Sequence, residues 1–238
     1  MFYIPGFPPG VKWLLIGNVA IFVIGYFSGL MQLYPFKDLW LIPAEVLKEG
    51  RLWELATYLF LHGGISHILW NMLALWMFGA DLEGTWGTRR FLQFYFFCGV
   101  GAGICVVLAN YLLPWGNPRI PTIGSSGAIF GILMAYAMLY PTRTILFSFL
   151  IPIQVKYFVM IIGAIAFLSS FQVNNGVSEF AHLGGLLFGY VFLKTPKFNF
   201  DLAGPVRHQY SEWKLRRAKK KFQVYLRKQG SGRDPRVH

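Results

Sequence analysis

The sequence carries little charge. Only 13% of its 238 residues are Asp, Glu, Lys or Arg, and only ten of these are acidic. A soluble domain has about 25% charged residues. Hydrophobic residues make up 55% of the chain, with 23 Phe and 8 Trp among them. This balance excludes an ordinary soluble domain and predicts an integral membrane protein.

Cysteine is almost missing as well. Cys98 and Cys105 stand seven residues apart in one apolar stretch. On a helix their Cα atoms would be about 10 Å apart, too far for a disulfide. We expect two small buried apolar side chains, which say little about redox compartment. A short cleavable signal pattern is also absent from the start, because the first apolar run is long enough to span a membrane.

Long apolar runs dominate what is present. Six of them are predicted to cross the membrane. The fourth has 15 residues and would be about 22 Å long, shorter than a bilayer core of about 30 Å. One of its ends must therefore lie inside the membrane. The predicted crossings are residues 13–33, 66–80, 91–113, 126–140, 157–173 and 179–193.

Two connections are apolar without being long enough to span. Residues 34–64 mix aromatic and charged side chains, a composition typical of the bilayer interface. We expect an interfacial first loop with one or two short helices there. Residues 144–155 are uncharged but broken by Pro152, and twelve residues are too few to cross. They are predicted to form a second interfacial segment.

Residues 197–238 differ from the rest of the chain. They hold twelve Lys or Arg and three acidic residues, and so supply +9 of the net +12. A basic flank after the last crossing predicts a cytoplasmic tail, and six crossings then place the N-terminus in the cytoplasm too. Nucleic-acid binding is not expected. Helical spacing of apolar residues predicts an amphipathic helix that contacts anionic lipid, formed by Leu215, Ala218, Phe222, Tyr225 and Leu226.

Three polar residues share one depth in this topology. Ser126, His67 and His182 each lie 12 to 15 residues before the inner end of an outside-to-inside helix. At a rise of about 1.5 Å per residue, all three are about 18–22 Å above the inner boundary. Ionisable groups at such depth are costly and usually functional. The serine could instead belong to a helix-packing face with Gly127 and Gly131, but packing alone does not account for three coincident depths.

Three motifs together resemble the rhomboid intramembrane serine proteases. They are Gly124-Ser125-Ser126-Gly127, His67-Ile68-Leu69-Trp70-Asn71, and Ala181-His182-Leu183-Gly184-Gly185 followed by Gly189. The similarity extends over about residues 11–195. It implies an all-α membrane protein, a six-helix bundle with a short, partly buried fourth helix. The predicted division is a core of residues 1–196 and a basic cytoplasmic tail of residues 197–238.

The resemblance also implies roles for particular residues. Ser126 would be the nucleophile and His182 its general base, a dyad that needs no carboxylate. His67 and Asn71 would donate to the oxyanion together with the Ser126 N–H. No cofactor or metal is implied, and the substrates would be transmembrane proteins cut near the outer end of their membrane segment. A bacterial plasma membrane is the expected location. The expected packing glycines are Gly124, Gly127, Gly131, Gly185 and Gly189.

Several neighbouring residues allow two interpretations. Glu179, three residues before His182, could be a third member of the site, although a helix-capping role with Ser178 as N-cap is the simpler interpretation. Ser125 is predicted to cap the fourth helix. His62 is expected to be structural or interfacial. Trp53-Glu54 departs from the Trp-Arg that the family often shows, which leaves the anchoring of the first loop undetermined.

Two other functions compete with proteolysis by serine. A rhomboid-like protein could bind or escort transmembrane segments without cutting them. A metalloprotease could use His62, His67 and His182, but no His-Glu-x-x-His is present to supply a zinc site and its base. The sequence therefore favours a serine endopeptidase over both.

Overall fold

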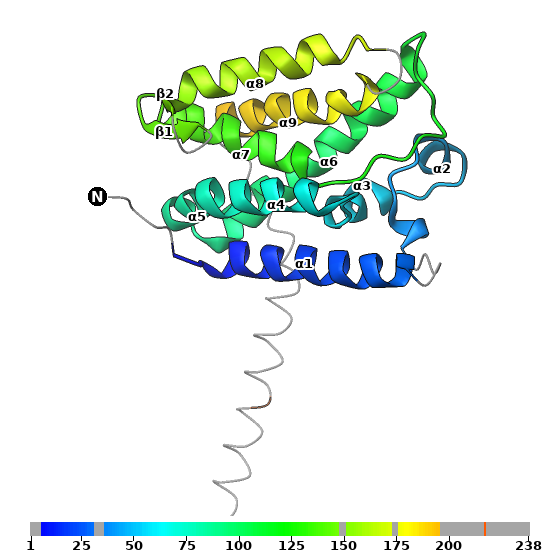
Figure 1. The fold of residues 1–238 in the computed structure, drawn as a ribbon, viewed down its shortest axis with the longest axis horizontal. Coiled ribbons are helices and arrows are strands. Elements are labelled where there is room, and N and C mark those ends of the chain that lie inside the picture. Colours follow the sequence, from blue (N-terminus) through cyan, green and yellow to red (C-terminus); the bar gives the residue numbers. More distant parts are fainter. Residues whose placement is uncertain (1–5, 31–35, 148–150, 173–175, 196–216, 218–238) are drawn as a thin grey trace, which may run out of the picture. The chain divides into compact units, whose positions relative to one another are not determined.

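The computed structural model describes residues 6–30, 36–147, 151–172, 176–195 and 217, and its core is a bundle of helices (Figure 1). Among these residues, two helices are long and apolar enough to span a membrane, α1 (Pro9–Leu30) and α6 (Thr88–Leu112). α7 (Ser126–Leu139) and α8 (Val155–Ser169) are shorter apolar helices, and α9 (Gly176–Lys194) completes the bundle. Six crossings remain a prediction, and the tail falls outside the described residues except for Arg217.

The predicted second crossing is longer than the sequence indicated. α4 (Ile65–Ala74), the π-helical turn η3 (Leu75–Gly79) and α5 (Ala80–Trp86) follow one another without a break. The helix therefore continues past residue 80, where the crossing was predicted to end, and passes through Asp81 and Glu83. Glu83 is buried because its carboxylate accepts the N–H groups of Gly10 and Val11, at 2.8 and 2.7 Å, at the start of α1. An acid that caps another helix need not mark the end of its own.

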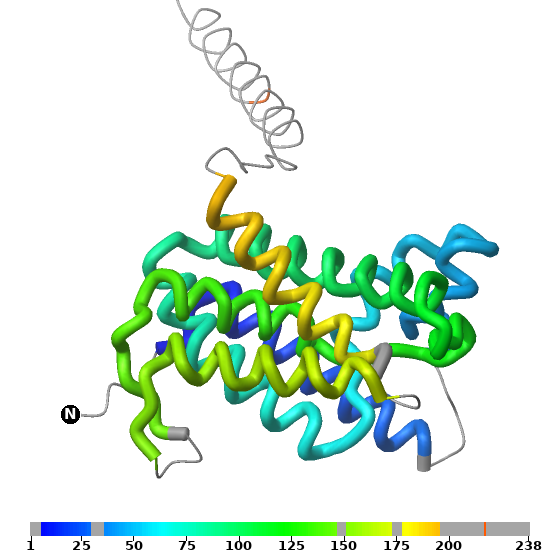
Figure 2. The backbone as a smooth tube through the Cα atoms, turned by 90° about the horizontal axis from the view of Figure 1, so that it is seen from above, coloured from blue at the N-terminus to red at the C-terminus, as the bar shows by residue number. Residues whose placement is uncertain are grey.

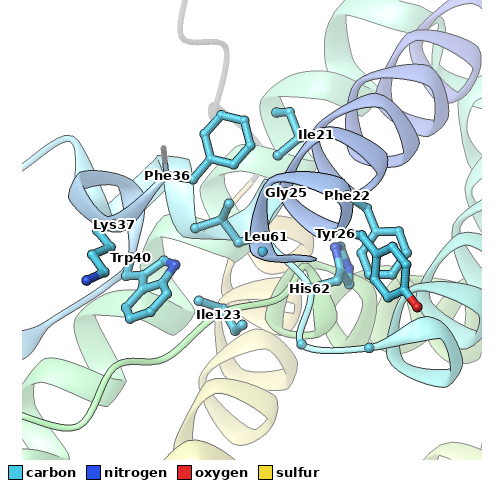
Figure 3. A pocket seen from close by; sticks show the side chains of 13 residues that line it. Ile21, Phe22, Gly25, Tyr26, Phe36, Lys37, Trp40, Leu61, His62 and Ile123 are labelled. Atoms are coloured by element: carbon cyan, nitrogen blue, oxygen red, sulfur yellow. The ribbon is translucent and has the colours of Figure 1, made fainter. Parts of the chain in front are cut away.

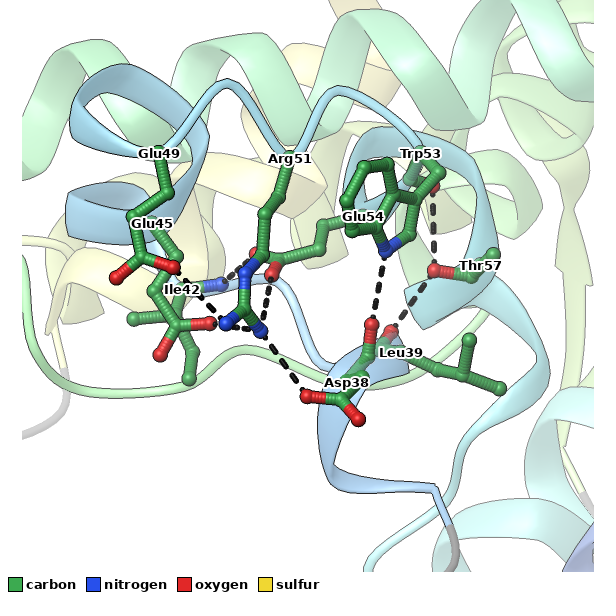
Figure 4. Close-up of polar contacts among 9 residues, drawn as sticks. All are labelled: Asp38, Leu39, Ile42, Glu45, Glu49, Arg51, Trp53, Glu54 and Thr57. Carbon is green, nitrogen blue, oxygen red and sulfur yellow. Dashed lines mark hydrogen bonds and ion pairs between the residues drawn. The ribbon is translucent and has the colours of Figure 1, made fainter.

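The first loop contains the expected short helices. They are η1 (Lys37–Leu39), α2 (Pro43–Lys48), α3 (Glu54–Thr57) and η2 (Tyr58–Phe60). Arg51 lies at its centre, where its guanidinium contacts Asp38 at 3.1 Å, Glu45 at 2.8 Å and Glu49 at 2.9 Å (Figure 4).

Trp53 and Glu54 anchor this loop by contacts of their own. The Trp53 indole N–H donates to the Asp38 carbonyl at 2.9 Å, and the buried Glu54 carboxylate accepts the Ile42 N–H at 2.8 Å. Glu54 also lies 3.9 Å from the Arg51 guanidinium. Trp53 and Glu54 thus hold the loop by bonding to the backbone of Asp38 and Ile42, earlier in the same loop. Arg51 supplies the positive charge near them.

The segment after α7 forms two paired strands, which the sequence did not predict, while its interfacial location stays a prediction. β1 (Thr144–Phe147) pairs antiparallel with β2 (Ile151–Gln154), with Thr144 opposite Gln154 and Phe147 opposite Ile151. Pro152 lies in β2, where a two-stranded ribbon has only edges and a missing N–H is tolerated. Each strand has four residues, too few to cross a membrane, in line with the predicted non-spanning segment.

α9 lies inside the bundle and packs on α6, α7 and α8 (Figure 1 and Figure 2). Its contact with α7 is made by backbone. A Cβ added at Gly185 would overlap the Gly127 carbonyl oxygen, and one at Gly189 would lie 2.9 Å from the Gly131 carbonyl oxygen. On its other face, Gly131 touches α6, where a Cβ would lie 2.5 Å from the Cys98 sulfur. The thiols of both cysteines are free, as expected, and that of Cys98 is buried.

Large apolar side chains point away from the bundle on its outer helices. They are exposed on both α1 and α8, a distribution that suits contact with lipid rather than water. The three most exposed on each helix are Trp13, Ile24 and Phe27 on α1, and Met160, Ile165 and Leu168 on α8.

Candidate active site

Ser126 and His182 meet where α7 begins. The Ser126 hydroxyl oxygen lies 2.9 Å from His182 Nε2, although the two residues are 56 positions apart. Ser126 is the first residue of α7 and His182 lies on the facing side of α9. The two backbones approach this closely because Gly127 and Gly185 have no side chains at the crossing. The glycines therefore set the distance between the hydroxyl and the imidazole.

The imidazole of His182 is held on two further sides. The Phe130 ring stacks on it with centroids 4.2 Å apart and an interplanar angle of 8°. Its Nδ1 lies 2.7 Å from a carboxylate oxygen of Glu179. Phe130 was not identified from the sequence. It follows Ser126 by four residues, and this spacing places both on one face of α7.

Gly124 shapes the backbone that leads into α7. Its φ is +122°, and a Cβ there would lie 2.7 Å from His67 Nε2. Its N–H donates to the Tyr58 carbonyl at 3.0 Å, while Leu41 and Thr122 form an isolated β-bridge. The first loop thus holds this segment in place. Gly124 lies just before α7, and the atoms that a Cβ there would meet belong to the His67 imidazole on α4.

The hydrogen bonding of His67 fixes its tautomer. The Gly63 N–H donates to His67 Nδ1 at 3.4 Å, so in the neutral ring the proton is on Nε2. That Nε2 faces Gly124, beside the start of α7. Asn71, one turn further along α4, is buried and donates to the His67 carbonyl at 2.9 Å. A side-chain amide has two N–H donors, and this bond occupies one of them.

Ser125 does not cap α7. It occupies the N-cap position, but its helical φ and ψ of −78° and 0° turn the hydroxyl away from the first turn, and no capping bond forms. Its hydroxyl is buried and lies 3.3 Å from His62 Nε2. His62 in turn sets its ring edge-on against His67, with centroids 5.0 Å apart. His62 thus contacts Ser125 and His67, which neighbour the Ser126–His182 pair, as the predicted structural role would require.

The environment of His62 keeps it uncharged. His62 lies in the loop before α4, where burial and then the neighbouring His67 lower its pKa to about 4. A neutral His62 can bond to the Ser125 hydroxyl without placing a positive charge next to His67.

A cavity of about 430 Å³ adjoins the site on the side of His62, between α1 and the first loop (Figure 3). Its walls are mostly apolar and aromatic, Lys37 also lines it, and His62, Gly63 and Ile123 border it toward the start of α7. The figure shows the Trp40 and Phe36 rings on the first-loop side and Tyr26 on the α1 side.

Comparison with known proteins places the chain in a family. The Rhomboid domain model matches residues 49–195. The chain is 36% identical over 146 residues to Rhomboid protease GluP of Bacillus subtilis, covering 61% of this chain and 26% of that protein. It is 27% identical over 187 residues to mitochondrial RHOMBOID-like protein 12 of Arabidopsis thaliana, covering 74% and 54%.

A second Arabidopsis thaliana protein, RHOMBOID-like protein 1, is 31% identical over 227 residues, covering 82% of this chain and 56% of that protein. The chain thus spans between about a quarter and just over half the length of these three relatives. The matched region contains all of the motifs around Ser126, His67 and His182. The chain belongs to the rhomboid family, whose members are integral membrane proteins and mostly intramembrane serine proteases.

Proposed function

We propose that the chain is an intramembrane serine endopeptidase with Ser126 as nucleophile and His182 as general base. The observation that carries this proposal is the 2.9 Å contact between the Ser126 hydroxyl oxygen and His182 Nε2. A serine hydroxyl is a weak nucleophile until an adjacent base can take its proton. The distance is within the range that this transfer requires.

In the first step the Ser126 oxygen attacks the carbonyl carbon of a peptide bond while His182 Nε2 takes the hydroxyl proton. The carbonyl oxygen becomes an oxyanion. When the tetrahedral intermediate collapses, the C–N bond breaks, and His182 returns its proton to the leaving amine. A water molecule then attacks the acyl-serine ester, again with His182 as base, and releases the new carboxyl end.

Three donors are suited to the oxyanion. The Ser126 N–H lies at the positive end of α7, where the first N–H groups have no partner within the helix. His67 presents a protonated Nε2 toward Gly124, next to the same helix end. The second N–H of Asn71 is the third donor. Each oxyanion donor typically contributes about 10²–10³ to turnover.

The substrates follow from the depth of the site and from the family. Rhomboid proteins act on transmembrane substrates within the membrane. Ser126 stands at the outer end of a short helix, so a substrate segment would be cut near its outer end. We also propose that both termini are cytoplasmic, in a bacterial plasma membrane, with the tail 197–238 on anionic lipid.

Labelling with a fluorophosphonate in detergent tests the reaction. The wild-type chain should form one covalent adduct, and Ser126→Ala should abolish both the adduct and the cleavage of a transmembrane substrate. Absence of an adduct in a folded wild-type chain would contradict the proposal. It would favour a rhomboid-like protein that binds transmembrane segments without cutting them.

A further inference from the structure

The carboxylate of Glu179 contacts the far side of the proposed base. Its Oε2 lies 2.7 Å from His182 Nδ1, while His182 Nε2 lies 2.9 Å from Ser126. The three groups form one chain from carboxylate to imidazole to hydroxyl. Glu179 and His182 are three residues apart on α9, so one rigid helix fixes their spacing.

This contact determines where the imidazole carries its proton. A carboxylate accepts hydrogen bonds and does not donate them when ionised, so Nδ1 must hold the proton. Nε2 is then unprotonated and directs its lone pair at the Ser126 hydroxyl. Without a partner at Nδ1, part of the population would be protonated at Nε2 and unable to accept the serine proton. The same carboxylate stabilises the imidazolium that forms when the proton moves.

Helix capping does not account for the direction of this side chain. α9 begins at Gly176, so Ser178 is already inside the helix rather than at its N-cap. An acid in the first turn favours the helix dipole whichever way it points. A dipole contribution alone gives no reason for the carboxylate to lie 2.7 Å from Nδ1 of His182.

We propose that Glu179 is a positioning residue that completes a Ser126–His182–Glu179 triad. This inference rests on the proposed function. Glu179 acts through His182 and does not touch the scissile bond. The Phe130 ring fixes the plane of the imidazole, and Glu179 fixes its tautomer and its rotation within that plane.

Three variants of the full chain in detergent test this role. Glu179→Gln keeps the size and removes the charge, Glu179→Asp keeps the charge on a shorter stem, and Ser178→Ala is the matched control in the same helix turn. We expect kcat of Glu179→Gln to fall by about 10²-fold with KM unchanged. Loss of a buried triad acid costs about 10⁴-fold. The smaller value is expected because the Glu179 side chain is 28% exposed, so water can partly replace it.

The other variants separate positioning from structural support. Glu179→Asp should recover part of the lost kcat, and Ser178→Ala should behave as wild type. Fluorophosphonate labelling of Glu179→Gln should slow in parallel with kcat, while its thermal unfolding midpoint stays close to that of the wild type. A lower midpoint with unchanged kcat would show that Glu179 only supports the helix, and would overturn the inference.

Nitrogen-15 NMR of the histidine side chains gives a measurement independent of turnover. His182 should be a single tautomer with the proton on Nδ1 in the wild type, and Glu179→Gln should add a population protonated on Nε2. An unchanged tautomer in Glu179→Gln would overturn the positioning role even if Ser126-dependent labelling is intact. Loss of labelling in the wild type, with the tautomer shift present, would overturn the proposed function instead.

Discussion

The two sides of α7 are packed in different ways. Toward α9, Gly127 and Gly131 meet Gly185 and Gly189 backbone to backbone. Toward α8, methionines from both helices line a cavity of about 300 Å³, and Lys156 stands at its edge. The cavity is lined by Met134 and Met138 of α7, Met160 and Gly163 of α8, and Leu186 of α9.

This difference makes the α7–α9 contact rigid and leaves the α7–α8 contact able to adjust. Backbone contacts cannot relax by changing rotamer, so the α7–α9 side holds Ser126 and His182 at a fixed distance. Methionine has three rotatable bonds and fills irregular space, so the α7–α8 side can adjust at low cost. The most rigid packing of α7 therefore lies next to Ser126 and His182, whose separation must be kept for proton transfer.

Removal of the His182 imidazole should have the largest effect. It tests whether the rigid α7–α9 contact serves to hold a catalytic base next to Ser126. His182→Ala should lower kcat by about 10³-fold or more, because the serine loses its base. The folded bundle should persist, since the backbone contacts at Gly185 remain. Turnover measured in detergent, with circular dichroism as a check on folding, gives the result. Substantial residual cleavage would mean that another group takes the proton.

Truncation of Asn71 tests whether this side chain is one of the oxyanion donors beside the Ser126–His182 pair. Asn71→Ala should lower kcat by about 10²–10³ with little change in KM, as expected for one lost donor. Steady-state kinetics on a transmembrane substrate separates the two constants. A rise in KM alone would make Asn71 a packing residue, since its amide also bonds to the His67 carbonyl.

A pair of glycine substitutions compares the backbone contact between α7 and α9 with the cavity beside α8. Gly185→Ala should destabilise the chain by about 1–3 kcal/mol or more, because its Cβ would overlap the Gly127 carbonyl. Gly163→Ala should change stability by no more than about 1 kcal/mol, since its Cβ meets only the Leu186 side chain at 3.2 Å and alanine favours a helix. Thermal unfolding in detergent measures both. Equal losses would show that Gly163, beside the cavity at α8, is packed as tightly as the crossing of α7 and α9.

Substitution of the serine next to the nucleophile should have a small effect. Ser125→Ala removes the 3.3 Å contact with His62 but leaves the Ser126–His182 contact in place. Most activity and full fluorophosphonate labelling should remain, in contrast to Ser126→Ala. The reverse pattern in folded variants would exchange the assignments of the two serines.

The sequence predicted the parts of the site that depend on helix geometry. The positions of Ser126, His67 and His182 along their helices follow from the constant rise per residue. Their common depth stays a prediction, and the helix that carries His67 runs past the charges at Asp81 and Glu83 to Trp86. The start of α7 at Ser126 was also predicted correctly.

Contacts between distant segments could not be predicted in the same way. Glu83 caps α1 from 72 and 73 residues away, and no local pattern indicates this. The Ser125 hydroxyl turns to His62 because the loop conformation, rather than residue type, decides its direction. The pairing of Thr144 with Gln154 joins two short apolar runs, and periodicity within either run does not indicate which segment it pairs with.

The carboxylate of Glu54, buried beneath Arg51 in the first loop, couples folding to proton uptake. Burial, opposed by the Ile42 N–H and reinforced by the nearby Glu45, raises the pKa of Glu54 to about 7. The ordinary value is 4.5, so between about pH 4.5 and 7 the folded chain binds a proton that the unfolded chain releases. Stability should therefore fall as pH rises through this window, and Glu54→Gln should flatten that slope in thermal unfolding. Glu49→Gln, on the same arginine but more exposed, should leave the slope unchanged. At neutral pH the protonated and ionised forms of Glu54 coexist, so the first loop of a membrane-embedded bundle responds to the acidity of the water outside it.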